Sequence, residues 1–273
     1  MLNVCAKRRP GFLVAALALL VFPFPLDAQV PAAQDIIRRA DQVLFYPGSD
    51  MWAKVQMRLI TKEGSERLRE MIMLRKNFPN GRQRYFIYFH SPADVRGMTF
   101  MVWRHPPQNA DRWLFLPGLN MTRRIAASDA RSSFVGSDFS YEDVSGREVD
   151  ADTHTLVRED TLNGRPVYVI RSVPKDEKSV EFSYRLAWID QESFVTWREE
   201  YYDKRGQLYK VYTADKVAQV DGLWTTLRRT MENVQNGHRT VVTFLEVRYN
   251  VGLEDSLFSE RYLRNPPARW TRW

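Results

Sequence analysis

Residues 180–188, with the sequence Val-Glu-Phe-Ser-Tyr-Arg-Leu-Ala-Trp, carry the pattern that decides the fold class. Apolar or aromatic side chains occupy every second position from Val180 to Trp188, and Glu181, Ser183 and Arg185 stand between them. Successive side chains of an extended strand point to opposite faces of a sheet. The alternation therefore predicts a β-strand with one apolar face and one polar face.

The same two-residue period recurs along most of the chain. Asn-Gly or Asp-Gly turn signals at 163–164, 221–222 and 236–237 separate the periodic stretches, as in an antiparallel meander, sandwich or barrel. Helical spacing of apolar residues predicts one helix at 31–44, before the strands. The predicted strands are 51–60, 67–76, 84–90, 97–105, 112–117, 120–126, 165–173, 180–190, 194–203, 207–220, 223–233 and 239–249.

We expect one domain over residues 29–273, because no linker or change of composition divides its halves. A sheet of so many strands must curl, and curling encloses a concave face. Each aromatic residue taken singly is best explained as ordinary core, but together, with few helices to cover them, they predict an apolar cavity. The candidate cavity residues are Phe86, Tyr88, Phe100, Trp113, Phe115, Phe182, Tyr184 and Trp188.

The N-terminus has the three parts of an export signal. Basic residues at 7–9 precede a nearly uninterrupted apolar run at 11–24, and Ala28 is a small residue suited to cleavage. The run is shorter than the roughly 20 residues of a membrane-spanning helix, so an uncleaved anchor is the weaker alternative. We expect a signal peptide at 1–28, cleaved near Ala28, and a mature protein that is soluble in the periplasm.

Residues 123–144 interrupt the strand pattern. The spacing of Ser140 and Asp143 fits a capping box, and the Ser-Asp pairs at 128–129 and 137–138 are candidate helix N-caps. The segment is either a loop with short helices across the mouth of the sheet, or a lid whose aromatic side chains fill an empty cavity. A Ca²⁺ site is a third interpretation, but the carboxylates lack the spacing of a known calcium loop. The aromatic residues are Phe134, Phe139 and Tyr141, and the carboxylates are Asp129, Asp138, Glu142 and Asp143.

The run RRIAASDARSSFVGSDFSYEDV at 123–144, preceded by WLFLPGLN at 113–120, resembles the signature of the LolA-like family of outer membrane lipoprotein-sorting proteins. The resemblance implies an incomplete antiparallel β-barrel of about eleven strands with short helices across its concave opening. It also implies a periplasmic location, binding of lipid or acyl chains, and an inner-membrane lipid exporter of the resistance-nodulation-division type as a partner. The motif positions, assigned to the lid, are Arg123, Arg124, Ile125, Ser128, Asp129, Arg131, Ser132, Ser133, Phe134, Gly136, Ser137, Asp138, Phe139, Tyr141, Glu142 and Asp143.

The sequence lacks the common patterns of enzymatic sites. Its four histidines are isolated, and it has no HExxH, G-x-S-x-G, P-loop or G-x-G-x-x-G motif. Cys5, its one cysteine, precedes the apolar run, so the mature protein has no thiol for a disulfide, a nucleophile or a metal site. We expect no enzymatic activity, no cofactor and no metal. A hydrolase assembled from distant residues is the weaker alternative.

The formal net charge of +7 is a weak argument for nucleic-acid binding, because arginines are interleaved with acids. Arginines at the rim of an apolar cleft fit anionic lipid headgroups better, so we expect transient membrane contact and no nucleic acid. Residues 266–273 place Trp beside Arg, which fits either an interfacial anchor or a tail packed on the outside of the barrel.

We therefore expect a periplasmic carrier that shields the acyl chains of a lipid or lipoprotein during transfer between membranes. Methionine side chains adapt to varied shapes and would suit such a cavity. The alternative is a non-carrying accessory subunit of an inner-membrane lipid exporter. The methionines expected at the cavity are Met51, Met57, Met71, Met73, Met98 and Met101.

Overall fold

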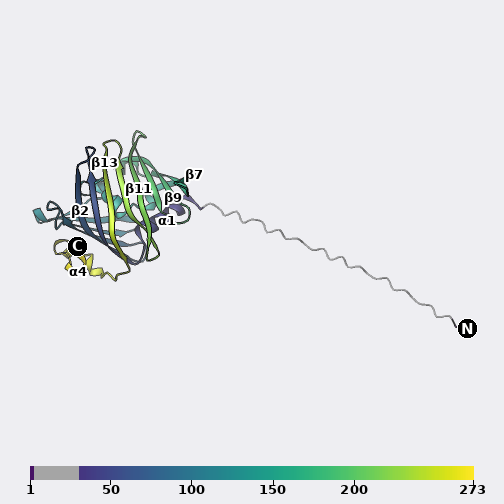
Figure 1. Cartoon of the computed structure of the whole chain (residues 1–273), viewed down its shortest axis with the longest axis horizontal. Coiled ribbons are helices and arrows are strands. Elements are labelled where there is room, and N and C mark those ends of the chain that lie inside the picture. The colour runs from purple at the N-terminus through teal and green to yellow at the C-terminus, as the bar shows by residue number, and fades with distance from the viewer. Residues whose placement is uncertain (3–30) are drawn as a thin grey trace. The chain divides into compact units, whose positions relative to one another are not determined.

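The computed structural model describes residues 1–2 and 31–273. The predicted signal peptide at 1–28 lies almost entirely outside the described residues and stays a prediction. Residues Pro31–Trp273 form one compact unit. A single antiparallel sheet of 13 strands dominates this unit, with short helices beside it (Figure 1).

The predicted opening helix is present as α1 (Ala33–Phe45). The strands of the first half are β1 (Asp50–Ile60), β2 (Glu66–Asn77), β3 (Gln83–Ser91), β4 (Thr99–His105), β5 (Gln108–Leu116) and β6 (Met121–Ile125). Those of the second half are β7 (Asp152–Leu162), β8 (Arg165–Pro174), β9 (Phe182–Asp190), β10 (Thr196–Asp203), β11 (Leu208–Val220), β12 (Leu223–Asn233) and β13 (His238–Tyr249). The remaining α-helices are α2 (Tyr141–Ser145), α3 (Glu260–Arg264) and α4 (Ala268–Thr271).

The order of strands in the sheet is β6-β5-β4-β3-β2-β1-β13-β12-β11-β10-β9-β8-β7. Each half of the chain is thus a meander, and the halves join where β1 pairs with β13, for example Met51 with Tyr249. The two edge strands, β6 and β7, are consecutive in the chain. Residues 126–151, which we call the cross-connection, therefore run from one edge of the sheet to the other.

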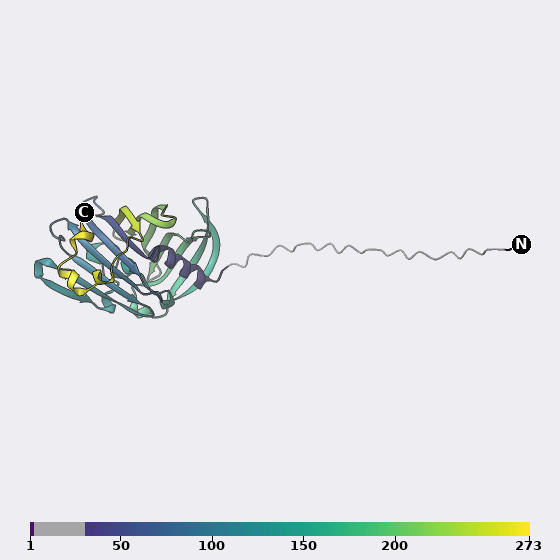
Figure 2. The same cartoon turned by 90° about the horizontal axis from the view of Figure 1, so that it is seen from below.

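The sheet has two apolar faces. On the face that we call inner, side chains from β1–β6 and β9–β13 form one cluster together with Phe134, Phe139, Tyr141 and Val144 of the cross-connection. Helix α1 covers β8 and β9 through a smaller cluster that contains Ile36. Because one cluster joins strands from both halves, the sheet curves around its inner face (Figure 2). The mainly β fold, an open curved sheet with short helices, agrees with the sequence-based prediction.

The sheet has 13 strands, more than the number of about eleven that the family resemblance implies. Twelve of them correspond to strands predicted from the sequence pattern, and the one that the pattern misses is β7, at 152–162. Its apolar residues are Leu156, Val157 and Leu162, and most of its side chains are at least half-exposed. Of these residues, Leu156 packs in the cluster beneath α1, and a strand with so few buried apolar side chains leaves little alternation to detect.

The C-terminal segment packs on the outer face of the first half, against Ile72, Leu74, Phe86 and Met101 among others. The yellow helices of Figure 2 lie against these strands. Two indole N–H groups of the sheet donate hydrogen bonds to backbone carbonyls of the C-terminal segment. Trp52 donates to Trp270 and Trp103 donates to Phe258, both at 2.9 Å. Residues 266–273 were expected to be either an interfacial anchor or a tail packed on the outside of the sheet. These contacts fit the packed tail.

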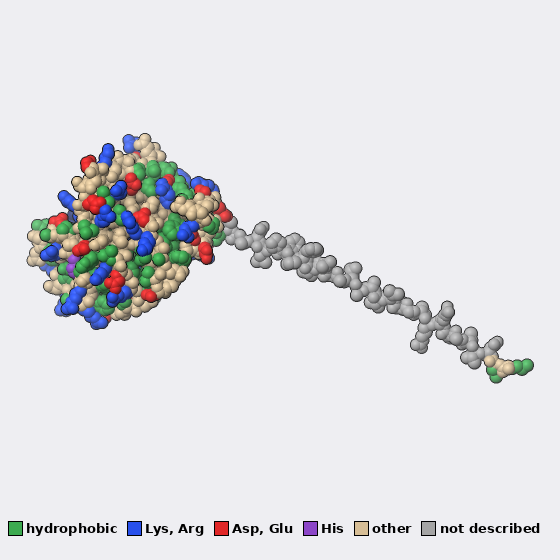
Figure 3. All heavy atoms as spheres, in the orientation of Figure 1, with side chains coloured by type: hydrophobic (Ala, Val, Ile, Leu, Met, Phe, Trp, Pro, Cys, Tyr) green, Lys and Arg blue, Asp and Glu red, His purple; other side chains and the backbone are tan. Residues whose placement is uncertain are grey.

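Figure 3 shows basic and acidic side chains interspersed over the face in view, with no patch of a single sign. Within residues 1–2 and 31–273, no helix reaches the length and apolar character needed to cross a membrane.

Asp50 fixes the start of the C-terminal segment. Its buried carboxylate accepts hydrogen bonds from the backbone N–H groups of Val251, Gly252 and Leu253 at 2.7, 3.0 and 2.9 Å. We expect Asp50→Ala to lower the free energy of unfolding by about 3 kcal/mol, because buried donors lose a charged partner. Urea unfolding measures this, with the exposed Asp35→Ala as the control. Equal losses in the two variants would contradict the anchoring role.

Candidate functional site

The candidate site is the space between the cross-connection, α1 and the inner face of the sheet. Residues 132–141 form a small hairpin, with a β-bridge between Ser133 and Ser140 and a 2.7 Å hydrogen bond from Phe134 N to Phe139 O. This hairpin turns at Val135 and Gly136, both with positive φ. It carries its aromatic side chains toward the sheet.

Phe134 is the centre of an aromatic cluster. Its ring centroid lies 5.2 Å from that of Phe100, 5.5 Å from that of Tyr141 and 6.1 Å from that of Phe89. Phe139 packs in the same inner cluster, beneath the guanidinium of Arg229 at 5.4 Å. The aromatic residues of this segment therefore pack on the inner face. That the segment is a lid stays a prediction.

Polar contacts tie the hairpin to the sheet. The Asp138 carboxylate accepts from Thr240 Oγ1 at 2.7 Å, and His238 Nδ1 lies 2.6 Å from the same oxygen. Arg69 donates to the carbonyl of Val135. These contacts set the position at which the aromatic side chains enter the inner cluster.

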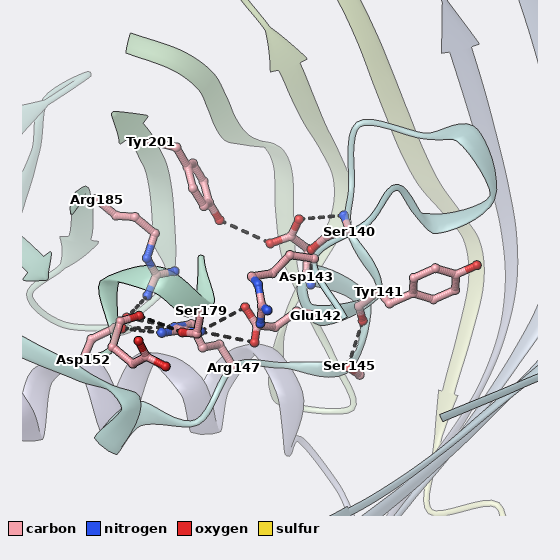
Figure 4. Close-up of polar contacts among 12 residues, drawn as sticks. Ser140, Tyr141, Glu142, Asp143, Ser145, Arg147, Asp152, Ser179, Arg185 and Tyr201 are labelled. Carbon is pink, nitrogen blue, oxygen red and sulfur yellow. Dashed lines mark hydrogen bonds and ion pairs between the residues drawn. The ribbon is translucent and has the colours of Figure 1, made fainter. Parts of the chain in front are cut away.

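The predicted capping box is confirmed at α2. Ser140 N donates to Asp143 Oδ2 at 2.7 Å, and Asp143 N donates to Ser140 Oγ at 3.0 Å (Figure 4). The other two N-cap predictions are wrong. Ala126 precedes the short 3₁₀ turn at 127–129, and Ser137 ends the turn at 134–136 instead of starting a helix.

The four carboxylates of the calcium interpretation have separate partners. Asp129 lies 3.4 Å from Arg123, and Glu142 lies 3.2 Å from Arg147. Asp138 bonds to Thr240, and Asp143 belongs to the capping box. Among the residues that the structure describes, no group of three or more acidic, His or Cys side chains is arranged to hold a metal ion.

The two halves of the motif differ in burial. Residues Phe134, Ser137, Asp138, Phe139 and Tyr141 are buried. The part nearer β6 is mostly exposed, and it comprises Arg123, Arg124, Ser128, Ser132 and Ser133. Gly136 is exposed at the tip of the hairpin.

Two adjoining cavities remain inside. One, of about 130 Å³, lies between α1, α2 and strands β9–β12, with Asp41, Phe139, Phe182 and Arg185 in its wall. The other, of about 40 Å³, lies under the C-terminal end of α1. Leu44, Phe45 and Arg229 belong to the walls of both. Together they are smaller than the roughly 300 Å³ of a typical ligand pocket.

One wall of the larger cavity is charged. Arg147 lies 2.7 Å from Asp152, which lies 2.7 Å from Arg185 (Figure 4). Arg185 also lies 2.8 Å from Glu199. Tyr201 donates from its hydroxyl to Glu199 at 2.9 Å. The chain of opposite charges leaves each buried ion with a partner, as burial requires.

The pKa values follow from this arrangement. Burial raises the pKa of Asp152, but the two arginines beside it outweigh burial and leave it below its ordinary value. Burial raises the pKa of Glu199, which Arg185 only partly offsets. Burial also raises the pKa of Asp41 to about 6, against the opposing charge of Arg104.

The structure places only part of the predicted cavity set on the inner face. Phe100 and Phe182 belong to the inner cluster. Tyr184 and Trp188 lie on the outer face, opposite the cavity-lining Arg185. Tyr184 stacks on Tyr202 with a centroid distance of 4.4 Å, and the guanidinium of Arg198 lies over the ring of Trp188. The residues found instead under the C-terminal segment are Phe86, Tyr88, Trp113 and Phe115.

The predicted inner position is wrong for the four residues under the C-terminal segment, because strands β3–β5 are apolar on both sides. On β3, Tyr85, Ile87 and Phe89 point inward, while Phe86 and Tyr88 point outward. Five of the six expected methionines lie in the inner cluster, whereas Met101 lies in the outer one.

The charged residues of the inner face were missed by the sequence analysis. A signal was present for Arg75, which has the same strand parity as Met71 and Met73; an arginine in register with an apolar face is the pattern that identifies it. Arg185 gave no such signal, because its parity is that of Glu181 and Ser183, and a register shift between β9 and β10 opposite residues 182–184 brings it to the inner face.

Comparisons with known proteins agree with the class that this fold defines, a curved open sheet crossed by the connection between its two edge strands. A family model described as that of an uncharacterized protein matches residues 81–265. No curated protein matches the chain. The crystal structure of a DUF1329 family protein from Desulfovibrio piger has 30% identity and a TM-score of 0.78, and the match covers 85% of this chain and 97% of that one.

Two further structures are similar. A putative outer membrane lipoprotein-sorting protein domain from Vibrio parahaemolyticus has 26% identity and a TM-score of 0.79, with 85% of this chain and 98% of that chain covered. A LolA superfamily protein from Nitrosomonas europaea has 21% identity and a TM-score of 0.67, with 85% and 100% covered. The chain belongs to the DUF1329 family. Its likeness to the lipoprotein-sorting domain and to the LolA superfamily protein agrees with the resemblance noted for its central motif.

The raised pKa of Asp41 can be used to test whether its carboxyl is buried in the cavity wall. Because its pKa is raised from 3.8 to about 6 on folding, the folded state binds the proton more tightly than the unfolded state. Its contribution to stability is complete below pH 4 and is lost as pH rises through 6. We expect Asp41→Asn to gain stability relative to the unmodified protein between pH 4 and 7, by up to about 3 kcal/mol. A difference in unfolding free energy that stays constant with pH would contradict the burial of this carboxyl.

Proposed function

We propose that this protein is a periplasmic carrier that shields the acyl chains of a lipid or lipoprotein on its inner face during transfer between the inner and outer membranes. The observation that carries the proposal is the aromatic hairpin of the cross-connection. Phe134, Phe139 and Tyr141 occupy the centre of a curved apolar face, and their segment packs there with few regular secondary-structure bonds. An acyl chain would take their place.

The energetics suit reversible exchange. Removing a sixteen-carbon chain from water contributes on the order of 12 kcal/mol, at about 0.8 kcal/mol per CH₂. Exposing the three aromatic side chains of the hairpin costs roughly 5–9 kcal/mol. The two quantities are close, so the hairpin would yield to an acyl chain and return when the chain leaves.

Loading requires movement of the hairpin, because the cavities total far less than an acyl chain needs. Val135 has φ of 51°, a left-handed conformation that is unfavourable for a β-branched residue. Leaving this conformation lowers the cost of displacement. Methionines such as Met57, Met71 and Met98 line the inner cluster and adapt to varied chains.

The proposed location rests on the export signal at 1–28 and on the names of the similar proteins. The proposed activity is binding and release without a chemical step. Transient contact with a membrane, and with an inner-membrane exporter of the resistance-nodulation-division type, would supply or receive the lipid.

A second candidate is a non-carrying accessory subunit of such an exporter. The observation in its favour is that the inner face is already filled by the protein's own side chains. A subunit of this kind would keep the hairpin in place permanently.

Co-extracted lipid distinguishes the two candidates. We expect the mature protein purified from the periplasm to contain a stoichiometric lipid by native mass spectrometry, and the delipidated protein to take up a fluorescent fatty acid. Absence of both signals would leave the accessory subunit as the better explanation.

Replacing Phe134, the central aromatic residue of the hairpin, tests whether the hairpin acts as a lid. Phe134→Ala removes its packing on Phe100 and Tyr141, which costs about 3–5 kcal/mol and favours the displaced hairpin. We expect tighter binding of a fluorescent fatty acid, by about tenfold or more. Phe258→Ala is the matched control, because Phe258 is equally buried but lies on the outer face. If both variants bind like the unmodified protein, the segment is a structural closure only.

A further inference from the structure

The two arginines in the wall of the 40 Å³ cavity, Arg75 and Arg229, lack a carboxylate partner among the described residues. Arg147, Arg185 and Arg104 each lie within 3.2 Å of an acidic side chain. Arg75, only 3% exposed, instead donates from Nη2 to the carbonyl of Pro47, and its Nε has no partner within the described part of the chain.

Arg229 is half-buried and likewise has no carboxylate partner among the described residues. Its guanidinium lies over the rings of Phe139 and Phe244, at 5.4 and 5.6 Å, and its Nε has no hydrogen-bond partner among the described residues. Placing two cations in an apolar interior without counter-ions is costly, and a bound anion would remove that cost.

A third donor completes the group. The hydroxyl of Tyr85, a residue 1% exposed, has no hydrogen-bond partner within residues 1–2 and 31–273. Tyr85 is the cross-strand partner of Arg75 on β3. All three residues line the 40 Å³ cavity under the C-terminal end of α1.

The chemistry of the group selects an anion. Guanidinium groups donate hydrogen bonds and accept none, and together they match the planar or tetrahedral oxygens of carboxylate and phosphate. Burial raises the pKa of Tyr85, which therefore stays a donor at neutral pH. The positive charges of Arg75, Arg104 and Arg229 lower the pKa of this hydroxyl, while the nearby Asp41 raises it.

The size and the surroundings of the cavity limit what can enter. A volume of 40 Å³ accommodates a group little larger than one water molecule, whose share of liquid volume is about 30 Å³. The adjoining larger cavity has an acidic wall in which Glu142, Asp152 and Glu199 already hold their own arginines. An anion is therefore favoured only at the Arg75–Arg229 end.

We propose that Arg75, Arg229 and Tyr85 form the binding site for a single carboxylate or phosphate group, the anionic headgroup of the lipid whose chain replaces the hairpin. This inference rests on the proposed carrier function and specifies its ligand class. The carrier would distinguish anionic from uncharged amphiphiles of the same chain length.

Displacement of a fluorescent fatty acid from the full mature protein tests the proposal, with dodecanoate, dodecyl phosphate, dodecanol and inorganic phosphate as competitors. We expect the two anionic amphiphiles to bind at least tenfold more tightly than dodecanol, as charged hydrogen bonds would provide. In Arg229→Gln this preference should fall to about threefold or less with dodecanol affinity unchanged, and in Arg229→Lys it should partly return.

Two further variants separate binding from structure. Tyr85→Phe removes only an unpartnered hydroxyl, so we expect unchanged or higher thermal stability together with a several-fold loss of preference for the anion. Arg198→Gln is the matched control, because Arg198 pairs with Glu200 on the outer face and should leave the preference unaltered.

The outcomes are distinct. Equal affinity for the three amphiphiles overturns the anion site and leaves the carrier function in place. Stabilisation by inorganic phosphate, lost in Arg229→Gln, with no binding of any amphiphile keeps the anion site and overturns the carrier function. No binding of any competitor overturns both.

Discussion

The structure depends on one covalent constraint: consecutive strands β6 and β7 form opposite edges of a 13-stranded sheet. The residues between them must cross from edge to edge, and this crossing brings Phe134 and Tyr141 over the inner face. Their burial against strands of both halves contributes to holding the sheet curved. The segment that closes the inner face is therefore also part of its core.

The cross-connection is held in two different ways. Near β7, Glu142 and Arg147 belong to a chain of buried ion pairs that reaches Arg185 on β9. Breaking one such pair leaves an uncompensated charge, which is strongly unfavourable. Residues 132–141 are held by aromatic packing and by polar contacts, notably those of the Asp138 carboxylate with Thr240 and His238. In the function that we propose, the ion pairs near β7 stay in place, and the aromatic hairpin is the part that an acyl chain replaces.

Much of the fold was predictable from local pattern. On β1, Met51, Ala53, Val55, Met57 and Leu59 alternate with polar residues, and they form the inner face as expected. The alternation decides the face there because the opposite side is less apolar. On β3 the same reasoning fails, since the cross-connection covers one side and the C-terminal segment covers the other. Both sides are then apolar, and parity alone cannot say which is inner.

The sequence by itself determined every strand except β7, the opening helix, the family resemblance and the position of the segment that interrupts the strand pattern, because periodicity, turn residues and a capping box act over a few neighbouring residues. Only the tertiary structure decided which aromatic residues face the interior, and only it brought Arg75, Tyr85 and Arg229 to one cavity. These residues lie on three strands, and β1 and β13 stand between β2 and β12 in the sheet. Their proximity follows from sheet order and curvature, which depend on long-range pairing and leave no local signal.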